Sequence, residues 1–134
     1  TPDEGEIPGE AVLTGTNAVE VLSAARLSKE QTRARNKETL LEIINSTELS
    51  DAQKQEAVDS MVHMTEIAEK EAAAEVLLQA KGFSEAVVSI NGDAVDVVVN
   101  AAELSDVQRA QIEDIVKRKT DIAAENIVIS TITQ

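Results

Sequence analysis

The sequence predicts an α+β domain: a three-stranded sheet with helices on one face, in the order αββαβ, preceded by an N-terminal helical extension. Two β-branched runs, 86–90 and 94–99, flank Asn91-Gly92, and Asn-Gly between such runs is the strongest short-range hairpin signal. A helix ending at Gly82 precedes this hairpin, and a capped helix followed by the β-branched run 127–133 comes after it.

The charge balance excludes nucleic acid as a partner. The chain of 134 residues carries 25 acidic and 12 basic residues, for a formal net charge of −13. Nucleic-acid affinity comes mainly from Lys and Arg that neutralise phosphates. The RNA-binding KH fold has a similar element order, but it needs a G-x-x-G loop, which this chain lacks.

Residues 1–16 form a predicted flexible acidic linker. This segment contains both prolines, three of the five glycines and four acids, but no base. The sequence has no apolar run of about 18 residues, the length that a membrane span needs. Because the chain begins at Thr1 without a Met, we expect that a targeting or anchoring part preceded it.

Residues 17–65 form the predicted N-terminal helical extension. Asn17 is the expected cap of a first helix that runs to about Ile44. The stretch 28–38 has almost nothing to bury, and five of the twelve basic residues lie in or beside it. Two explanations stay open: a solvated helix surface, or a docking face with Arg33, Arg35 and Lys37 for an acidic or polar partner.

A second helix begins at Ser50, where Gln53 completes a capping box, and it ends at Gly82. The same Glu-Leu-Ser-Asp-X-Gln string returns at 103–108 and predicts the start of the third helix. We place the boundary of the α+β domain, 66–134, within the second helix, although no Pro or Gly enforces a break near Thr65.

The predicted hairpin has a two-residue loop, with Ile90 opposite Asp93 and Val88 opposite Val95. This register places one set of residues on the core face: Ala86, Val88, Ile90, Val95, Val97 and Val99.

The third helix, from Asp106 to about Lys119, offers four apolar residues to that sheet: Val107, Ile112, Ile115 and Val116. We expect the first strand in the centre of the sheet and the last strand at an edge, where its unpaired backbone can accept another chain.

No set of residues predicts catalysis, a cofactor or a metal site. His63 is the single histidine, and a surface ion pair with Asp59 or Glu66 explains it better than a metal, which needs three or four ligands. Gly82 and Gly92 have turn roles, so no Gly-rich phosphate loop exists in the folded part. The sequence therefore favours a non-enzymatic binding or assembly protein.

The order and spacing of several segments resemble the stage III sporulation protein AH family over residues 20 to 132. The segments are Arg26-Leu27-Ser28-Lys29 with Arg33, the helix at 69–75, Ala80-Lys81-Gly82-Phe83-Ser84-Glu85-Ala86, the turn at 90–93, and Asp121-Ile122-Ala123-Ala124-Glu125-Asn126-Ile127.

This resemblance implies a ring-building domain similar to those of type III secretion inner-membrane ring proteins. It implies a channel or zipper between mother cell and forespore, with stage II sporulation protein Q as partner and self-association into a ring. It also implies a location in the intermembrane space, with an N-terminal anchor in the mother-cell-derived outer forespore membrane.

The expected partner-binding residues lie on the basic first helix and on the last strand: Arg33, Arg35, Lys37, Ile127, Val128, Ile129 and Thr131. An alternative is a soluble ACT-like regulatory domain that binds a small metabolite. That class usually places glycines in an exposed strand-to-helix loop, and the loop at 100–103 has none.

Overall fold

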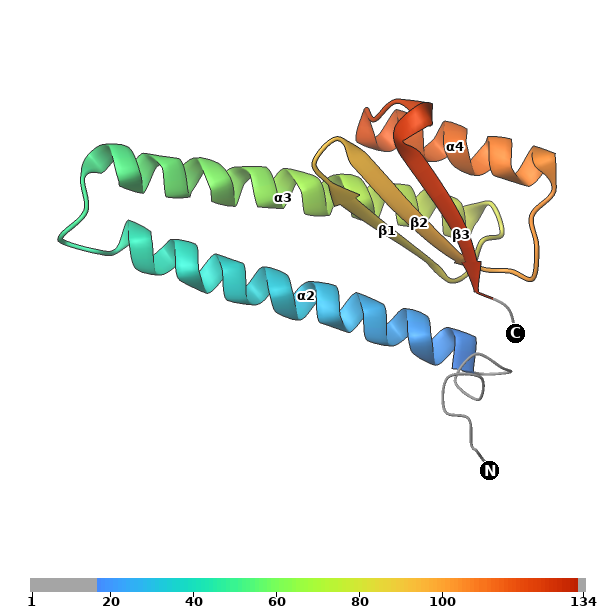
Figure 1. The fold of residues 1–134 in the computed structure, drawn as a ribbon, viewed down its shortest axis with the longest axis horizontal. Helices are drawn as coiled ribbons and strands as arrows, with labels where there is room; N and C mark the ends of the chain where they lie inside the picture. Colours follow the sequence, from blue (N-terminus) through green and yellow to red (C-terminus); the bar gives the residue numbers. More distant parts are fainter. Residues whose placement is uncertain (1–16, 133–134) are drawn as a thin grey trace.

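The computed structural model describes residues 17–132, and its elements follow the predicted order (Figure 1). They are α2 (Asn17–Ile44), α3 (Asp51–Ala80), β1 (Ala86–Asn91), β2 (Ala94–Asn100), α4 (Asp106–Thr120), the 3-10 turn η1 (Ala124–Asn126) and β3 (Ile127–Ile132). The α+β class and the N-terminal helical extension are confirmed. The predicted linker, 1–16, lies outside the described residues.

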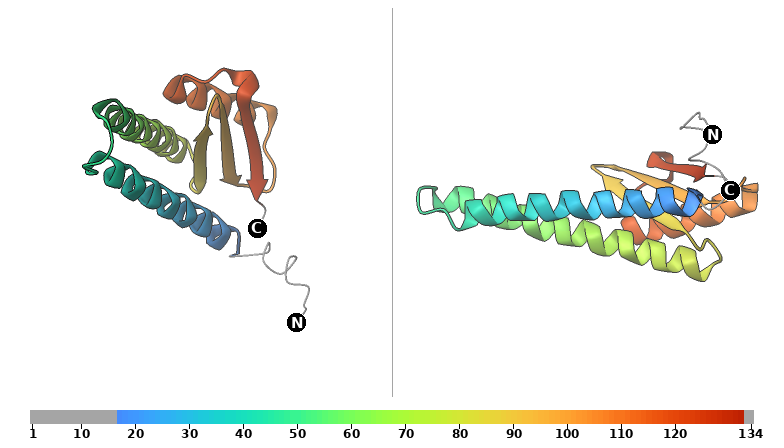
Figure 2. Two further views of the ribbon diagram at one scale, coloured as in Figure 1. Left: turned by 60° about the vertical axis from the view of Figure 1, so that its left-hand side comes forward. Right: turned by 90° about the horizontal axis from the view of Figure 1, so that it is seen from below.

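The first two helices form a long hairpin that extends beyond the sheet, and the sheet with α4 occupies the other end of the molecule (Figures 1 and 2). α3 is one continuous helix of 30 residues, so the predicted boundary after residue 65 falls inside it. The extension and the α+β unit therefore share α3, and their division into two domains stays a prediction.

Both repeated strings cap helices as predicted. The hydroxyls of Ser50 and Ser105 accept hydrogen bonds from the backbone N–H of Gln53 and Gln108, and both glutamine side chains bond back to the serine N–H. At the end of α3, Gly82 adopts a φ of +101°. The Phe83 N–H donates to the Leu78 carbonyl and the Gly82 N–H to the Gln79 carbonyl, as in a Schellman motif.

The predicted hairpin register is wrong by two residues. Ile90 pairs with Val95 and Asn91 with Ala94, so the turn residues are Gly92 and Asp93. Gly92 has a φ of +62° and Asp93 does not have positive φ, as in a type II′ turn. The observed register is favoured because it moves Asp93 off the core face and into the turn. A shift of two keeps every side chain on its predicted face.

The predicted strand order is also wrong, because β2 and not β1 is central (Figure 1). β1 pairs antiparallel with β2, and β3 pairs parallel with β2. A parallel neighbour requires a crossover connection, which α4 provides between β2 and β3. The placement of β3 at an edge is confirmed.

The hydrophobic core lies between one face of the sheet and the helices α3 and α4. Five of the six residues predicted for this face are at most 1% exposed: Ala86, Val88, Val95, Val97 and Val99. Leu78 of α3 and Ile112 of α4 are also fully buried against them. Val107 is 77% exposed, contrary to the prediction, because it lies about 140° from Ile112 around the helix.

Candidate functional site

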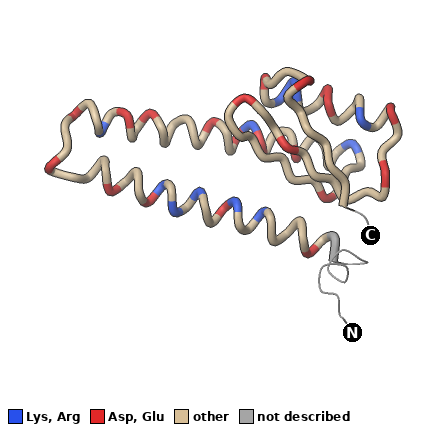
Figure 3. Tube along the Cα trace, viewed as in Figure 1, with Lys and Arg blue, Asp and Glu red and all other residues tan. Residues whose placement is uncertain are grey.

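The outer edge of β1 is occupied by charged side chains from α2 and α3. Three basic residues of α2 and two glutamates of α3 form a group that we call the charge clamp: Arg26, Lys29, Arg33, Glu71 and Glu75. The basic residues follow one another along the middle of α2 (Figure 3). On α2 and on α3, the spacing of three or four residues puts the members on one helix face.

Glu71 is the centre of the charge clamp. Its side chain is 3% exposed, and its carboxylate accepts from Lys29 Nζ at 3.0 Å, from Arg33 and from the backbone N–H of Ile90 at 2.7 Å. A buried carboxylate is stable only when it is paired and hydrogen-bonded. The cations of α2 are therefore what makes the burial of Glu71 tolerable.

The side chains of the charge clamp also form hydrogen bonds with other backbone groups at the edge of β1. Glu75 accepts from the backbone N–H of Val88 at 2.8 Å, and Lys29 Nζ donates to the Val88 carbonyl at 2.8 Å. Arg26 donates to the Ala86 carbonyl at 2.7 Å. Side chains thus satisfy the backbone of β1 from Ala86 to Ile90, where another strand would otherwise pair.

The outer edge of β3 differs in every one of these respects. β3 pairs with β2 on one side only, and among residues 17–132 none of the charged side chains that hold the edge of β1 bonds to the backbone of β3. Its sequence, IVISTI, contains no charge and no proline. We call this edge, Ile127–Ile132, the open edge.

The predicted partner-binding residues on β3 point to both faces of the sheet. Ile127 is buried, and Ile129 and Thr131 are half-buried on the core face, whereas Val128 is 53% exposed on the opposite face. Val128 therefore offers the most accessible side chain of this set, and the others contribute mainly through their backbone.

The predicted basic docking face on α2 is divided by the structure. Arg33 is engaged within the molecule through Glu71. Arg35 and Lys37 are exposed, and among the described residues Arg35 bonds only Thr32 while Lys37 forms no hydrogen bond or ion pair. The polar middle of α2 thus contributes Arg33 to the charge clamp and leaves Arg35 and Lys37 in solvent. It does not lie beside β3.

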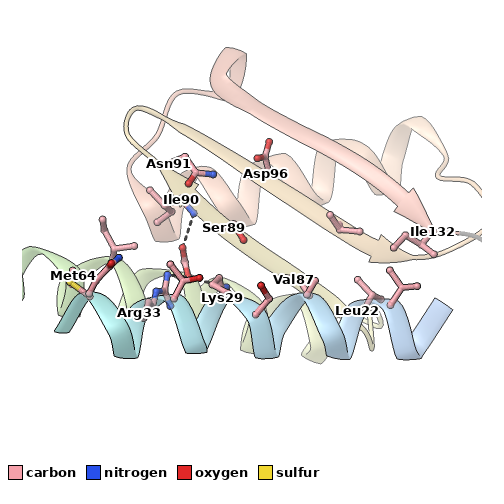
Figure 4. A pocket seen from close by; sticks show the side chains of 18 residues that line it. Leu22, Lys29, Arg33, Met64, Val87, Ser89, Ile90, Asn91, Asp96 and Ile132 are labelled. Atoms are coloured by element: carbon pink, nitrogen blue, oxygen red, sulfur yellow. Dashed lines mark hydrogen bonds and ion pairs between the residues drawn. The ribbon is translucent and has the colours of Figure 1, made fainter. Parts of the chain in front are cut away.

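A hollow of about 690 Å³ lies between α2 and the face of the sheet that points away from the core (Figure 4). Leu22 and Val87 form part of its apolar wall, and Ile132 brings β3 to its rim. Asp96 and Ser89 supply polar groups on the sheet side. α2 therefore touches this face of the sheet without filling the space beneath it.

Within the part of the chain that the structure describes, no group of three or more His, Cys, Asp or Glu side chains is placed to hold a metal ion. None of the described helices is long and apolar enough to cross a membrane. The site thus offers strand pairing, ion pairing and apolar contact.

Sequence reasoning missed the charge clamp, although a signal was present. Lys29 and Arg33 are four residues apart, as are Glu71 and Glu75, and these two pairs have opposite charge on two helices joined by a short turn. Matching such pairs between helices, in addition to searching within each helix, predicts the contact.

Comparison with known proteins agrees with this architecture. Residues 5–129 match the family model described as SpoIIIAH-like protein. The stage III sporulation protein AH of Bacillus subtilis (strain 168) is 28% identical over 108 residues, which are 81% of this chain and 50% of that relative. The chain thus spans about half the length of that relative.

A chain in the solved structure of the SpoIIQ-SpoIIIAH pore forming complex has the same fold. The TM-score is 0.76 at 24% sequence identity, with 85% of this chain and 98% of the other chain covered. The fold described above is thus shared with a chain of that complex. The chain belongs to the SpoIIIAH-like protein family.

Proposed function

We propose that this chain is a non-enzymatic assembly domain of sporulation, which binds a SpoIIQ partner through the open edge of β3. Membership of the SpoIIIAH-like family supports the sporulation role, and the fold shared with a chain of the SpoIIQ-SpoIIIAH complex supports the choice of partner. In this proposal the domain lies between the two forespore membranes, tethered on its N-terminal side to the mother-cell-derived membrane.

The observation that carries the proposal is the contrast between the two edges of the sheet. Proteins usually protect an edge strand with charges, Pro or a covering element, because an unprotected edge pairs with other chains. β1 is protected by the charge clamp, whereas β3 is six residues of uncharged, largely β-branched sequence. An edge left unprotected in a chain of this family is suited to accept a partner strand.

The experiment is size exclusion coupled to light scattering, on this domain, on the extracellular domain of SpoIIQ from the same organism, and on their mixture. We expect a mixed species that neither chain forms alone. Val128→Lys with Ser130→Lys places charges at the open edge without touching the core, because both residues are exposed. This variant is expected to bind at least about 10-fold more weakly, a loss of about 1.4 kcal/mol.

The matched control is Val62→Lys with Ser60→Lys on α3. Val62 is 53% exposed, the same fraction as Val128, and Ser60 is also exposed. We expect this control to bind within about 3-fold of the unmodified domain, since scattered surface positions contribute little to binding energy. Two separate peaks at high micromolar concentration would contradict the proposal and favour a small-ligand domain, with the hollow under α2 as the site to screen.

A further inference from the structure

We infer that α2 is a releasable cover of the β1 edge, and that a β1 edge freed of α2 accepts the open edge of a second copy. While α2 is bound, strand pairing by this domain is restricted to β3. The inference takes from the proposed function only the pairing role of β3, and it concerns the other edge of the sheet.

α2 lies outside the hydrophobic core. The core consists of residues from α3, the three strands and α4, together with the loops that join them. Within residues 19–44 of α2, Leu22 is the only buried side chain. Release of α2 therefore leaves the core cluster of the αββαβ unit in place, and the buried residues that it uncovers, such as Leu22 and Val87, lie outside that cluster.

The attachment of α2 to the edge of β1 is polar and incomplete. The side chains of Lys29 and Arg33 are 18% and 28% exposed, so their ion pairs are partly hydrated and are weakened by salt. Arg26 Nε is buried without a hydrogen-bond partner among the described residues, and such a donor lowers stability. The hollow of about 690 Å³ removes further contact between α2 and the sheet.

Release of α2 removes hydrogen-bond partners from the edge of β1. The carbonyls of Ala86 and Val88 lose their donors, because both donors belong to α2. Glu71 loses both of its cations at the same moment and gains access to water, which favours a hydrated carboxylate over one held on the Ile90 N–H. The Ala86 and Val88 carbonyls at this edge are then unpaired, while the Val88 N–H keeps its bond to Glu75 of α3 until a pairing strand displaces it.

The consequence for assembly follows from symmetry. A head-to-tail assembly needs two different complementary surfaces on each subunit. With α2 bound, the sheet has one free edge, so strand pairing ends after one event. With α2 released, the sheet has two free edges. The uncharged β3 of one copy can then pair with β1 of the next.

The experiment compares two double charge reversals on α2. Lys29→Glu with Arg33→Glu repels Glu71 and Glu75, whereas Arg35→Glu with Lys37→Glu makes the same two reversals at exposed positions outside the charge clamp. Amide hydrogen exchange, followed by NMR, measures how well the backbone N–H groups of Val88 and Ile90 are protected. In the clamp variant we expect their exchange to accelerate at least about 10-fold, while that of Val97 in central β2 stays within about 3-fold.

Light scattering then measures association. The clamp variant is expected to gain mass with concentration, and adding Val128→Lys with Ser130→Lys is expected to abolish the gain. The matched variant at Arg35 and Lys37 is expected to behave as the unmodified protein. A clamp variant whose Val88 and Ile90 amides exchange fast while its mass stays monomeric would overturn the inference.

If the Lys29→Glu, Arg33→Glu variant unfolds, native-state hydrogen exchange in the unmodified protein still tests the inference. Native-state exchange of the Val88 and Ile90 amides should be faster than that of Val97, and 1 M NaCl should accelerate it further, since the Debye length is then about 3 Å. Exchange of all three amides at one common rate would overturn the inference. Partner binding through β3 is a separate readout, so failure of the proposed function is distinguishable from failure of the α2 cover.

Discussion

Removal of the Glu71 carboxylate is expected to cost the domain about 3 kcal/mol of unfolding free energy. Glu71→Ala leaves the Ile90 N–H without the acceptor that lies 2.7 Å away, and an unsatisfied buried amide costs about 1–3 kcal/mol. It also removes the shared partner of Lys29 and Arg33. Because both cations stay partly exposed, that loss adds only about 1 kcal/mol.

Urea unfolding followed by circular dichroism measures this loss, and thermal unfolding should show a Tm lower by about 10 °C. Glu71→Gln keeps an oxygen for the Ile90 N–H and loses only the charge, so we expect about half of the effect. Glu69→Ala is the control on the same helix, because Glu69 is exposed and forms no hydrogen bond or ion pair with the described residues. A loss below about 1 kcal/mol for Glu71→Ala, or one equal to the control, would refute a stabilising clamp.

Three further predictions concern the αββαβ unit and are read by urea unfolding. Ser105→Ala removes the capping box of α4 and should cost about 1 kcal/mol, whereas an unchanged midpoint would contradict a stabilising cap. Gly82→Ala forces a side chain into a φ of +101° and should cost about 1 kcal/mol, although nothing lies within 4 Å of the added Cβ. Leu78→Ala opens a cavity at a fully buried position and should cost about 3 kcal/mol, and a loss under 1 kcal/mol would place Leu78 outside the core.

Local signals predicted the helices and the core face correctly. The first helix was expected to follow a cap at Asn17 and to run to about Ile44; the structure has the same end but includes Asn17 in the helix. Both Ser-x-x-Gln strings form capping boxes. These features depend on neighbours within one or two turns of the chain. The core face of the hairpin also follows from alternation alone, because apolar residues on one face share one parity.

Features that depend on contacts distant in sequence were predicted less well. Asn91-Gly92 and Gly92-Asp93 are both acceptable turns, and the choice between them depends on keeping Asp93 off the core face. The position of β3 depends on which edge of the hairpin is available, and the β1 edge is occupied by α2 and α3. A contact such as that between Lys29 and Glu71, 42 residues apart, has no local signature on either helix alone.

The most direct test of the account is the footprint of SpoIIQ on this domain, measured residue by residue as amide protection. If β3 is the docking strand, SpoIIQ should slow the exchange of amides in 127–132 by at least about 10-fold, while the Val88 and Ile90 amides keep their rates. Protection confined to Arg35 and Lys37 on α2, or to β1, with unchanged exchange in 127–132, would contradict it.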